Sequence, residues 1–442
     1  MSKGRVLLIE PEYSSEDVIF WIPIGIAIIA AFVRDNNYEV MIVDNAINNY
    51  SDTELVNIIG KFNPDIVGIS GVTLRYPGMK RVSRLVREFF SKVLLIGGGV
   101  HVTARPEEGV DLFDVIIIGE AESAFLEISN KFMAFLEKSR EIYNDIPGLC
   151  YRNESGEIVY TREQLIITNL DDLPFPAYDL LDIHSYSELG RKSINIITSR
   201  GCPFNCSFCA SPFLYKHKVR YNSVSYVVRL MDHLFEKYHI NNFFISDDIF
   251  PLNEARVIEL CNQLIAKNKG YSMNCLTHAK LANADIYKLM KKAGFVTISI
   301  GIESGNDEIL KKISKGITVR ESIEAIKAIK EAGILVQALY MIGNIGETEE
   351  TIMDTINFAK EYNPQFENGQ RVGYNVFQYA LPYPGTRFQK EVAQYGDLLL
   401  EDYCLMPLFE PTFIPKGLTK SKMMELMDRA VNESGTVWKI SS

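Results

Sequence analysis

The segment Thr198-Ser-Arg-Gly-Cys202-Pro-Phe-Asn-Cys206-Ser-Phe-Cys209 places three cysteines within eight positions, in the spacing CxxxCxxC. Thiolates are ligands of soft metals. Structural zinc usually takes four protein ligands, often as two separated pairs, and no second cysteine pair or histidine pair follows here. Three cysteines on one loop therefore favour a [4Fe–4S] cluster in which one iron is left open to a substrate.

The chain after this segment alternates between strand-like and helix-like runs. Apolar runs of strand length lie at 194–198, 243–246, 272–276, 296–300, 336–342 and 374–379, and helical patterns lie at 223–238, 253–267, 283–293, 319–332, 348–361 and 386–395. Six strand–helix units are too few to close an eight-stranded barrel. The pattern predicts an open, partial (β/α)6 barrel.

The chain before the segment shows the same alternation. Strand runs lie at 6–9, 40–43, 66–69, 93–96 and 115–118, with helical patterns at 22–35, 52–62, 77–90 and 121–138. Fully apolar strands that alternate with helices indicate a parallel sheet covered on both faces. We expect an α/β protein with a doubly wound, Rossmann-like domain at 1–144, a connector with a small hairpin at 145–190, the partial barrel at 191–395 and a small helical region at 396–442.

The loops of the first domain predict which ligands it accepts. A dinucleotide needs a glycine-rich first turn, whereas residues 10–17 contain four carboxylates and no glycine, so NAD and FAD are not expected. Glycines and hydrogen-bonding side chains follow the later strands, and these are the candidate cofactor contacts: Ser70, Thr73, Gly97, Gly98, Gly99, His101, Gly119 and Glu120.

Composition and charge limit the partners and the compartment that we expect for the protein. The net charge is −10 and there is no basic stripe, which argues against nucleic acid as a partner. The uncharged run at 18–33 has 16 residues and contains Pro23 and Gly25, whereas a membrane-spanning helix needs about 20 apolar residues. We interpret it as the first helix of a soluble domain and expect no membrane span. The cysteines form no disulfide framework, which favours a reducing, cytoplasmic location.

The cysteine segment resembles the CxxxCxΦC signature of the radical S-adenosylmethionine (SAM) superfamily, in which Φ is aromatic. The resemblance implies that Cys202, Cys206 and Cys209 bind the cluster and that Phe208 lies beside the adenine of SAM. It also points to cofactor contacts at Asp247, at Glu303 and Ser304 in the stretch Gly301-Ile-Glu-Ser-Gly305, and at Gly343 in the turn Gly343-Asn-Ile-Gly-Glu-Thr348.

Each of these contacts has a structural alternative. Asp247 could merely end a strand, Glu303 could lie on the surface, and Gly343 could serve only the turn. Lys315 and Arg320 could anchor a carboxylate, although we expect both on solvated helix faces.

The similarity extends over nearly the whole chain to the class in which a cobalamin-binding domain precedes the radical SAM barrel. It rests on Pro23-Ile-Gly25, on 97–107, on 115–122 and on Leu173-Pro-Phe-Pro-Ala-Tyr-Asp179. The D-x-H-x-x-G motif that supplies a cobalt-ligating histidine in other cobalamin enzymes is absent. We expect His101 to contact the corrin edge or the nucleotide tail rather than the metal. The alternative is a first domain that is vestigial or binds substrate.

The resemblance implies a cobalamin-dependent radical SAM enzyme that cleaves SAM reductively to a 5′-deoxyadenosyl radical. Methylation of an unactivated carbon, or of a phosphinate phosphorus, in a small-molecule substrate is the leading interpretation. An external electron donor of the flavodoxin or ferredoxin type is implied as a partner. The alternatives are a radical cyclase or rearrangement enzyme, such as an anaerobic porphyrin oxidative cyclase, and a non-catalytic iron–sulfur or cobalamin sensor. A tRNA methylthiotransferase would need three more cluster cysteines, but Cys150 is the only cysteine before Cys202.

Overall fold

The computed structural model describes residues 2–13, 21–135, 140–164, 166–186, 193–400, 402 and 410–435. The chain divides into two compact units, of which the first comprises residues 1–186 and the second most of the remainder. The residues expected to form a connector, up to 186, therefore belong to the first unit. Within the described ranges, no helix combines the length and the apolar character that crossing a membrane requires.

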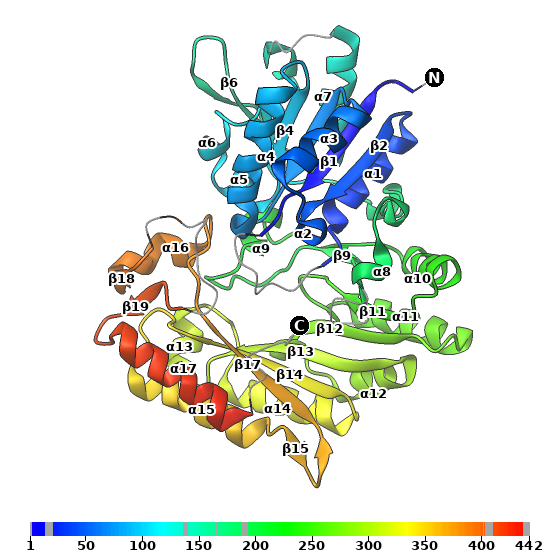
Figure 1. The fold of residues 1–442 in the computed structure, drawn as a ribbon. Helices are drawn as coiled ribbons and strands as arrows, with labels where there is room; N and C mark the ends of the chain where they lie inside the picture. Colours follow the sequence, from blue (N-terminus) through cyan, green and yellow to red (C-terminus); the bar gives the residue numbers. More distant parts are fainter. Residues whose placement is uncertain are drawn as a thin grey trace. The chain divides into compact units, whose positions relative to one another are not determined.

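The first unit is built on one sheet (Figure 1). Its described strands run in the order β2-β1-β3-β4-β5-β6-β7, the first five parallel and the last two antiparallel. They are β1 (Arg5–Glu10), β2 (Glu39–Asp44), β3 (Ile66–Ser70), β4 (Leu94–Gly98), β5 (Val115–Ile117), β6 (Leu149–Arg152) and β7 (Ile158–Tyr160). The doubly wound sheet and the hairpin are as predicted, and the hairpin adds its two strands to the edge of this sheet.

Helices cover both faces of this sheet. One apolar core contains residues of α1 (Ile24–Asp35) and α7 (Glu122–Phe135), and the other contains residues of α3 (Asp52–Phe62) and α4 (Tyr76–Phe89). Burial on both faces explains why the central strands are apolar throughout. The short helices α2 (Asn45–Asn48), α5 (Val100–Ala104) and α6 (Pro106–Gly109) are additions that the sequence pattern did not predict.

The second unit carries a parallel sheet that stays open. Its described strands run in the order β17-β14-β13-β12-β11-β8. They are β8 (Ile194–Ile196), β11 (Asn242–Ile245), β12 (Ser272–His278), β13 (Phe295–Glu303), β14 (Leu335–Ile342) and β17 (Gly373–Tyr379). This is the predicted six-stranded partial barrel, with strand order following chain order.

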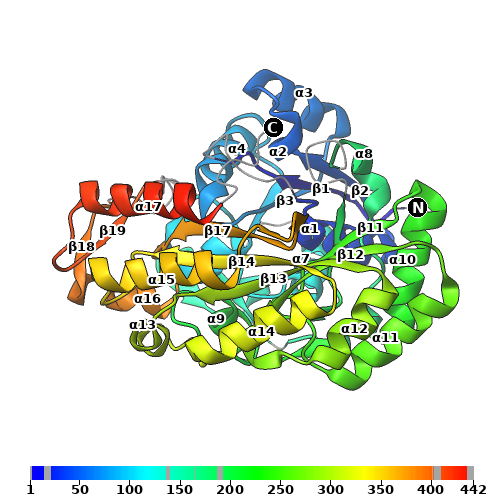
Figure 2. The ribbon, with the colours of Figure 1, turned by 90° about the horizontal axis from the view of Figure 1, so that it is seen from below.

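The main helices of the second unit follow these strands and lie in a row along the outer face of the sheet (Figure 2). They are α10 (Val224–Tyr238), α11 (Glu254–Lys267), α12 (Ala284–Ala293), α14 (Val319–Glu331) and α15 (Glu349–Tyr362), with α17 (Lys420–Ser434) packed beside α15. Smaller elements surround the carboxyl ends of the strands, including α9 (Ser211–Tyr215), α13 (Asp307–Lys312), α16 (Arg387–Glu391) and the antiparallel pair β9 (Ser199–Arg200) and β10 (Arg220–Tyr221).

Candidate functional site

The three cysteines lie on a loop that leaves the carboxyl end of β8 through β9. Gly201 has φ +94°, and a Cβ there would lie 2.2 Å from the carbonyl oxygen of Lys218, so only glycine fits the start of this loop. Cys202, Cys206 and Cys209 are all partly exposed. Partly exposed thiols on one loop are accessible to a metal group.

The chemistry of these thiols fits an iron–sulfur cluster. Burial raises the pKa of Cys202 to about 11 and that of Cys209 to about 12, and the charge of Cys206 contributes to both shifts. The three thiols are therefore close enough to influence one another. In the part of the chain that the structure describes, no three His, Cys, Asp or Glu side chains converge on a single metal ion. The fit to a cluster rests on the three soft sulfur donors and their spacing.

Two aspartates after β11 hold the first part of the loop. Both carboxylate oxygens of Asp247 accept hydrogen bonds, from the backbone N–H groups and hydroxyls of Thr198 and Ser199, over 2.6–3.0 Å. Asp248 accepts a bond from the N–H of Gly201 at 2.9 Å. A cofactor contact at Asp247 stays a prediction; in this structure its carboxylate binds the segment Thr198–Ser199. It positions the chain that leads into the cysteines.

The second part of the loop is held through Ser207. Its N–H donates to the carbonyl of Ile313 at 2.9 Å, and its carbonyl accepts from the N–H of Phe388 at 2.8 Å. Phe208 packs against an apolar cluster that includes Ile345, Ala380, Phe388, Val392 and Phe413. The aromatic residue of the signature is thus anchored by residues far along the chain while it stays half-buried beside Cys209.

A buried ion pair lies next to the cysteine loop. Glu303, at the end of β13, has φ +67°, and its Oε1 lies 2.8 Å from Nζ of Lys315. The two side chains are 9% and 7% exposed. A Cβ on Gly301 would lie 2.4 Å from Oε1 of Glu303 and 2.7 Å from Nζ of Lys315, so the pair packs directly on the Gly301 backbone.

This ion pair excludes the surface alternative for Glu303 and corrects the expectation for Lys315. Glu303 is not a surface residue, and Lys315 is not on a solvated helix face. Burial alone would lower the pKa of Lys315, but the negative charges of Glu303 and Cys206 outweigh it and raise the pKa above 10.5. Nζ also lies 5.8 Å from the centre of the Phe208 ring. Arg320, by contrast, is exposed and pairs with Glu324 on its own helix, as expected for a solvated face.

Ser304 and Gly343 have structural surroundings. Ser304 is fully buried, and its hydroxyl lies 3.1 Å from the hydroxyl of Thr355 and accepts a bond from the N–H of Asn306. Gly343 has φ +93°, and its N–H donates to Glu347 at 2.6 Å. A cofactor contact at Ser304 stays a prediction; in this structure its hydroxyl lies in the core. The positive φ of Gly343 serves the turn, and a cofactor contact at this residue stays a prediction.

His101 and Thr73 of the first unit are buried and contact each other. The His101 ring is 1% exposed, stacks on Tyr76 at 4.1 Å, and places Nε2 3.1 Å from Glu108 and Nδ1 3.4 Å from Thr73. Burial lowers the pKa of His101. The expectation that His101 contacts the corrin edge or the nucleotide tail stays a prediction; in this structure α5 places the ring in the core.

The loops after β3 and β4 contact each other through glycines, with open space beside Gly98. Gly99 has φ +97°, and a Cβ there would lie 2.5 Å from the carbonyl oxygen of Gly71, so these two loops touch through their backbones. Gly98 has open space beside it, and Ser70 is half-buried. Strand order reverses direction between β1 and β3, and ligands of doubly wound folds bind at such a point. Gly98 and Ser70 at this edge are compatible with cobalamin held without a protein histidine.

The other predicted cofactor contacts of the first unit have neighbours or hydrogen-bond partners within the protein. A Cβ on Gly97 would meet the Phe113 ring at 2.6 Å, so Gly97 is a packing residue. Gly119 has φ +87° and donates its N–H to the hydroxyl of Thr103 at 3.0 Å. Glu120 accepts a bond from the N–H of Ile167 at 3.0 Å.

A charged group that the sequence did not reveal lies at the ends of β1, β2 and β3. Arg75 is 3% exposed and pairs with Glu10 at 2.5 Å, and its guanidinium lies 3.9 Å from the centre of the Tyr13 ring. Burial raises the pKa of Glu10 to about 7 and that of Asp44 to about 6, although Arg75 opposes both shifts. The carboxylates that argued against a dinucleotide are thus partly enclosed in ion pairs. Glu16 and Asp17 lie outside the described residues.

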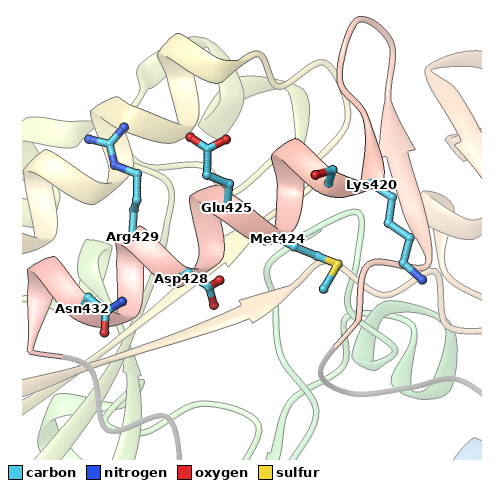
Figure 3. Close-up of a pocket in the computed structure, with 7 residues that line it drawn as sticks. Lys420, Met424, Glu425, Asp428, Arg429 and Asn432 are labelled. Carbon is cyan, nitrogen blue, oxygen red and sulfur yellow. The ribbon is translucent and has the colours of Figure 1, made fainter.

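A depression on the surface of α17 is a separate feature (Figure 3). It is lined by Lys420, Ser421, Met424, Glu425, Asp428, Arg429 and Asn432, which all come from one helix. Lys420 pairs with Glu410 and Arg429 with Glu433. These are the contacts of a solvated helix face, and no residue of the cysteine site takes part.

An open parallel barrel sheet with a three-cysteine loop after its first strand, preceded in the chain by a doubly wound domain, defines a class of iron–sulfur enzymes. Comparison with known proteins identifies this class. The chain matches the Radical SAM superfamily over residues 196–359 and the B12 binding domain over residues 18–129.

Individual relatives agree with these matches. The chain is 32% identical to the "Uncharacterized methyltransferase PH0819" of Pyrococcus horikoshii, over 92% of this chain and 86% of the relative. It is 26% identical to the anaerobic magnesium-protoporphyrin IX monomethyl ester cyclase of Rubrivivax gelatinosus, over 97% and 76% of the two chains. Its fold is similar to that of the radical SAM methyltransferase TsrM from Kitasatospora setae, with a TM-score of 0.75, 17% identity, and coverage of 96% and 84%.

The chain belongs to the radical SAM superfamily, within the group that carries a B12 binding domain. It is an enzyme, and its cofactors are a [4Fe–4S] cluster, SAM and cobalamin. The family resemblance and the cofactor set inferred from the sequence are confirmed.

Proposed function

We propose that the protein is a cobalamin-dependent methyltransferase that methylates an unactivated carbon, or a phosphinate phosphorus, of a small-molecule substrate. The observation that carries this proposal is the combination, in one chain, of a three-cysteine barrel loop with a B12 binding domain that lacks an available histidine ligand. The methyltransferase names of the Pyrococcus and Kitasatospora proteins support it. When bound, the cluster supplies the electron that cleaves SAM, and cobalamin supplies a transferable methyl group.

Each residue of the barrel site has a role in this proposal. Cys202, Cys206 and Cys209 hold the cluster, and Phe208 offers an apolar face to the adenine. Lys315 is the anchor for the carboxylate of SAM, because its buried ammonium has three N–H donors and Glu303 is the only hydrogen-bond acceptor found for it among the described residues. Glu303 orients Lys315 and keeps it charged.

The first unit holds the second cofactor in this proposal. The backbone of Gly98 and the hydroxyl of Ser70 bind cobalamin at the edge where strand order reverses. Gly99 and Gly119 supply turn conformations that other residues rarely adopt. The proposal keeps the protein in the cytoplasm and gives it an external electron donor of the flavodoxin or ferredoxin type.

A radical cyclase is the second candidate, and a specific observation favours it. The similarity to the Rubrivivax cyclase extends over 97% of this chain, including both cofactor domains. Both activities need the same cofactors, so the products of SAM distinguish them.

The test is anaerobic reconstitution with iron, sulfide and cobalamin, followed by simultaneous measurement of 5′-deoxyadenosine and S-adenosylhomocysteine. A methyltransferase of the proposed kind forms both products in the presence of its substrate, because it consumes SAM both to start the reaction and to remethylate cobalt. A cyclase forms 5′-deoxyadenosine alone. Formation of neither product by protein that contains both cofactors, across a panel of candidate substrates, would favour a sensor.

A further inference from the structure

His278 is a buried histidine at the end of β12 that no step of the proposed reaction uses. Its ring is 3% exposed. In the sheet it lies opposite Gly301, the residue on whose backbone the Glu303–Lys315 pair packs. His278 therefore lies next to both the cysteine loop and the Glu303–Lys315 ion pair.

The ring faces the cysteine loop on one side. It stacks on Phe204 with the ring centres 3.8 Å apart and the planes 7° from parallel. Phe204 lies midway between Cys202 and Cys206. Stacked rings of this kind restrict both partners, so the contact limits the movement of the part of the loop that joins two cluster ligands.

The ring nitrogens fix the other side. Nδ1 accepts a hydrogen bond from the N–H of Lys280 at 3.3 Å, so Nδ1 carries no proton. Nε2 then carries the proton of the neutral ring and donates it to the carbonyl oxygen of Lys315 at 2.9 Å. Burial and the nearby Lys315 ammonium lower the pKa of His278 to about 3, in agreement with a neutral ring.

The carbonyl that accepts this bond belongs to a tight turn. Ser314 and Gly316, on either side of Lys315, both have positive φ, at +53° and +74°. Arg387 donates to the hydroxyl of Ser314 at 2.6 Å. The direction in which the Lys315 side chain leaves this turn depends on how the turn is held, and His278 holds it at Lys315 itself.

We propose that His278 is a positioning residue that keeps the cysteine loop and the Lys315 turn in fixed register, through its stacked ring and its Nε2 proton respectively. The proposal rests on the proposed function, in which the loop holds the cluster and Lys315 anchors SAM. The two contacts of His278 then have different effects. The stacked ring slows the loss of the cluster, and the Nε2–H bond to Lys315 sets the affinity for SAM.

Two variants separate these consequences. His278→Phe keeps a ring against Phe204 but removes the donor to Lys315. His278→Gln keeps an N–H donor at a similar reach but removes the ring. His233→Phe, on the outer helix α10, is the matched control for replacing a histidine by phenylalanine.

The measurements are iron content after reconstitution, the rate at which a chelator removes the iron, and the dissociation constant for SAM. We expect His278→Phe to lose affinity for SAM about fivefold, which is the scale of one neutral hydrogen bond, with wild-type iron content and chelation rate. We expect His278→Gln to lose iron to the chelator about fivefold faster, on the scale of one aromatic pair, with affinity for SAM closer to that of the wild type. His233→Phe should match the wild type throughout.

Each other outcome overturns the proposal. Wild-type affinity for SAM in His278→Phe would show that the Nε2 proton does not position Lys315. Equal losses in both properties, in both variants, would show that His278 only stabilises the core. A wild-type protein that takes up no cluster or binds no SAM would refute the proposed function, and this inference with it, which distinguishes that failure from failure of the inference alone.

Discussion

The buried carboxyl of Glu10 makes the stability of the first unit depend on pH. Burial raises its pKa from 4.5 to about 7, and Arg75 only partly opposes this. A carboxyl with a higher pKa in the folded state holds its proton more firmly when folded. Its contribution to stability is therefore complete below pH 4.5 and is lost as the pH rises through 7.

The magnitude follows from the size of the shift. A change of one pKa unit corresponds to about 1.4 kcal/mol, so the shift at Glu10 corresponds to about 3 kcal/mol of unfolding free energy between pH 4.5 and pH 7.5. Asp44, whose pKa burial raises from 3.8 to about 6, acts in the same direction. Asp44 stays in place in a Glu10→Gln variant. The difference between wild type and variant therefore isolates Glu10.

The assay uses the full chain and the fluorescence of Trp21, which belongs to the first unit. The only other tryptophan, Trp438, is replaced by phenylalanine in every sample. Urea unfolding is measured from pH 4.5 to pH 7.5. We expect the stability of Glu10→Gln, relative to the wild type, to increase by about 3 kcal/mol over this range. Glu88→Gln, which removes an exposed carboxylate from α4, is the control.

Two results would refute this reasoning. If Glu10→Gln and the wild type change in parallel with pH, the carboxyl is not desolvated as the structure shows. If the variant instead becomes less stable relative to the wild type as the pH rises, then the ion pair with Arg75 outweighs burial, and the pKa of Glu10 is lowered in the folded protein.

The remaining predictions concern the two cofactor sites. The iron–sulfur absorbance at about 400 nm should be lost in each of the variants Cys202→Ala, Cys206→Ala and Cys209→Ala. Cys261→Ala should retain this absorbance, and its loss in that variant alone would contradict the ligand assignment. Asp247→Asn should lower iron content after reconstitution, because it removes a carboxylate that accepts four bonds at the start of the loop, and wild-type iron content would contradict that role. Gly99→Ala should destabilise the first unit by roughly 1–3 kcal/mol, measured by Trp21 fluorescence, because its Cβ would lie 2.5 Å from the Gly71 carbonyl oxygen. Bound Co(II) cobalamin should show no nitrogen splitting from a protein imidazole in its EPR spectrum, and splitting that disappears in His101→Ala would show that the ring leaves the core to bind cobalt.

Local periodicity was sufficient to predict both sheets. The apolar runs that were assigned as strands correspond to β1–β5 in the first unit and to β8, β11, β12, β13, β14 and β17 in the second. The principal helices agree to within a few residues, because each has an apolar face of helical period and many begin at a capping side chain such as Ser51 or Thr318. Short helices such as α5 and α13 have too few residues to show a period.

The polar contacts of the site could not be predicted in this way. Lys315 was assigned to a solvated face because lysine is seldom buried. Its burial depends on Glu303, which is 12 residues away and has the positive φ that brings its carboxylate to Nζ. His101 was expected at the ligand edge because it follows a glycine turn, but α5 begins at Val100 and rotates the ring towards Tyr76. In both cases the position of the side chain depends on a local backbone conformation that the sequence pattern does not predict.

The cysteine loop depends on contacts that come from much later in the chain. Asp247 and Asp248 hold its beginning, His278 stacks on its middle, and Ile313 and Phe388 bond to Ser207 within its last part. These partners lie at or after the ends of four different strands of the barrel sheet, so the geometry of the loop depends on most of that sheet. A cluster can be held by three thiols only when their separations are fixed. We infer that cluster binding and completion of the barrel stabilise each other, since any group that binds the folded state alone adds its binding free energy to that of folding.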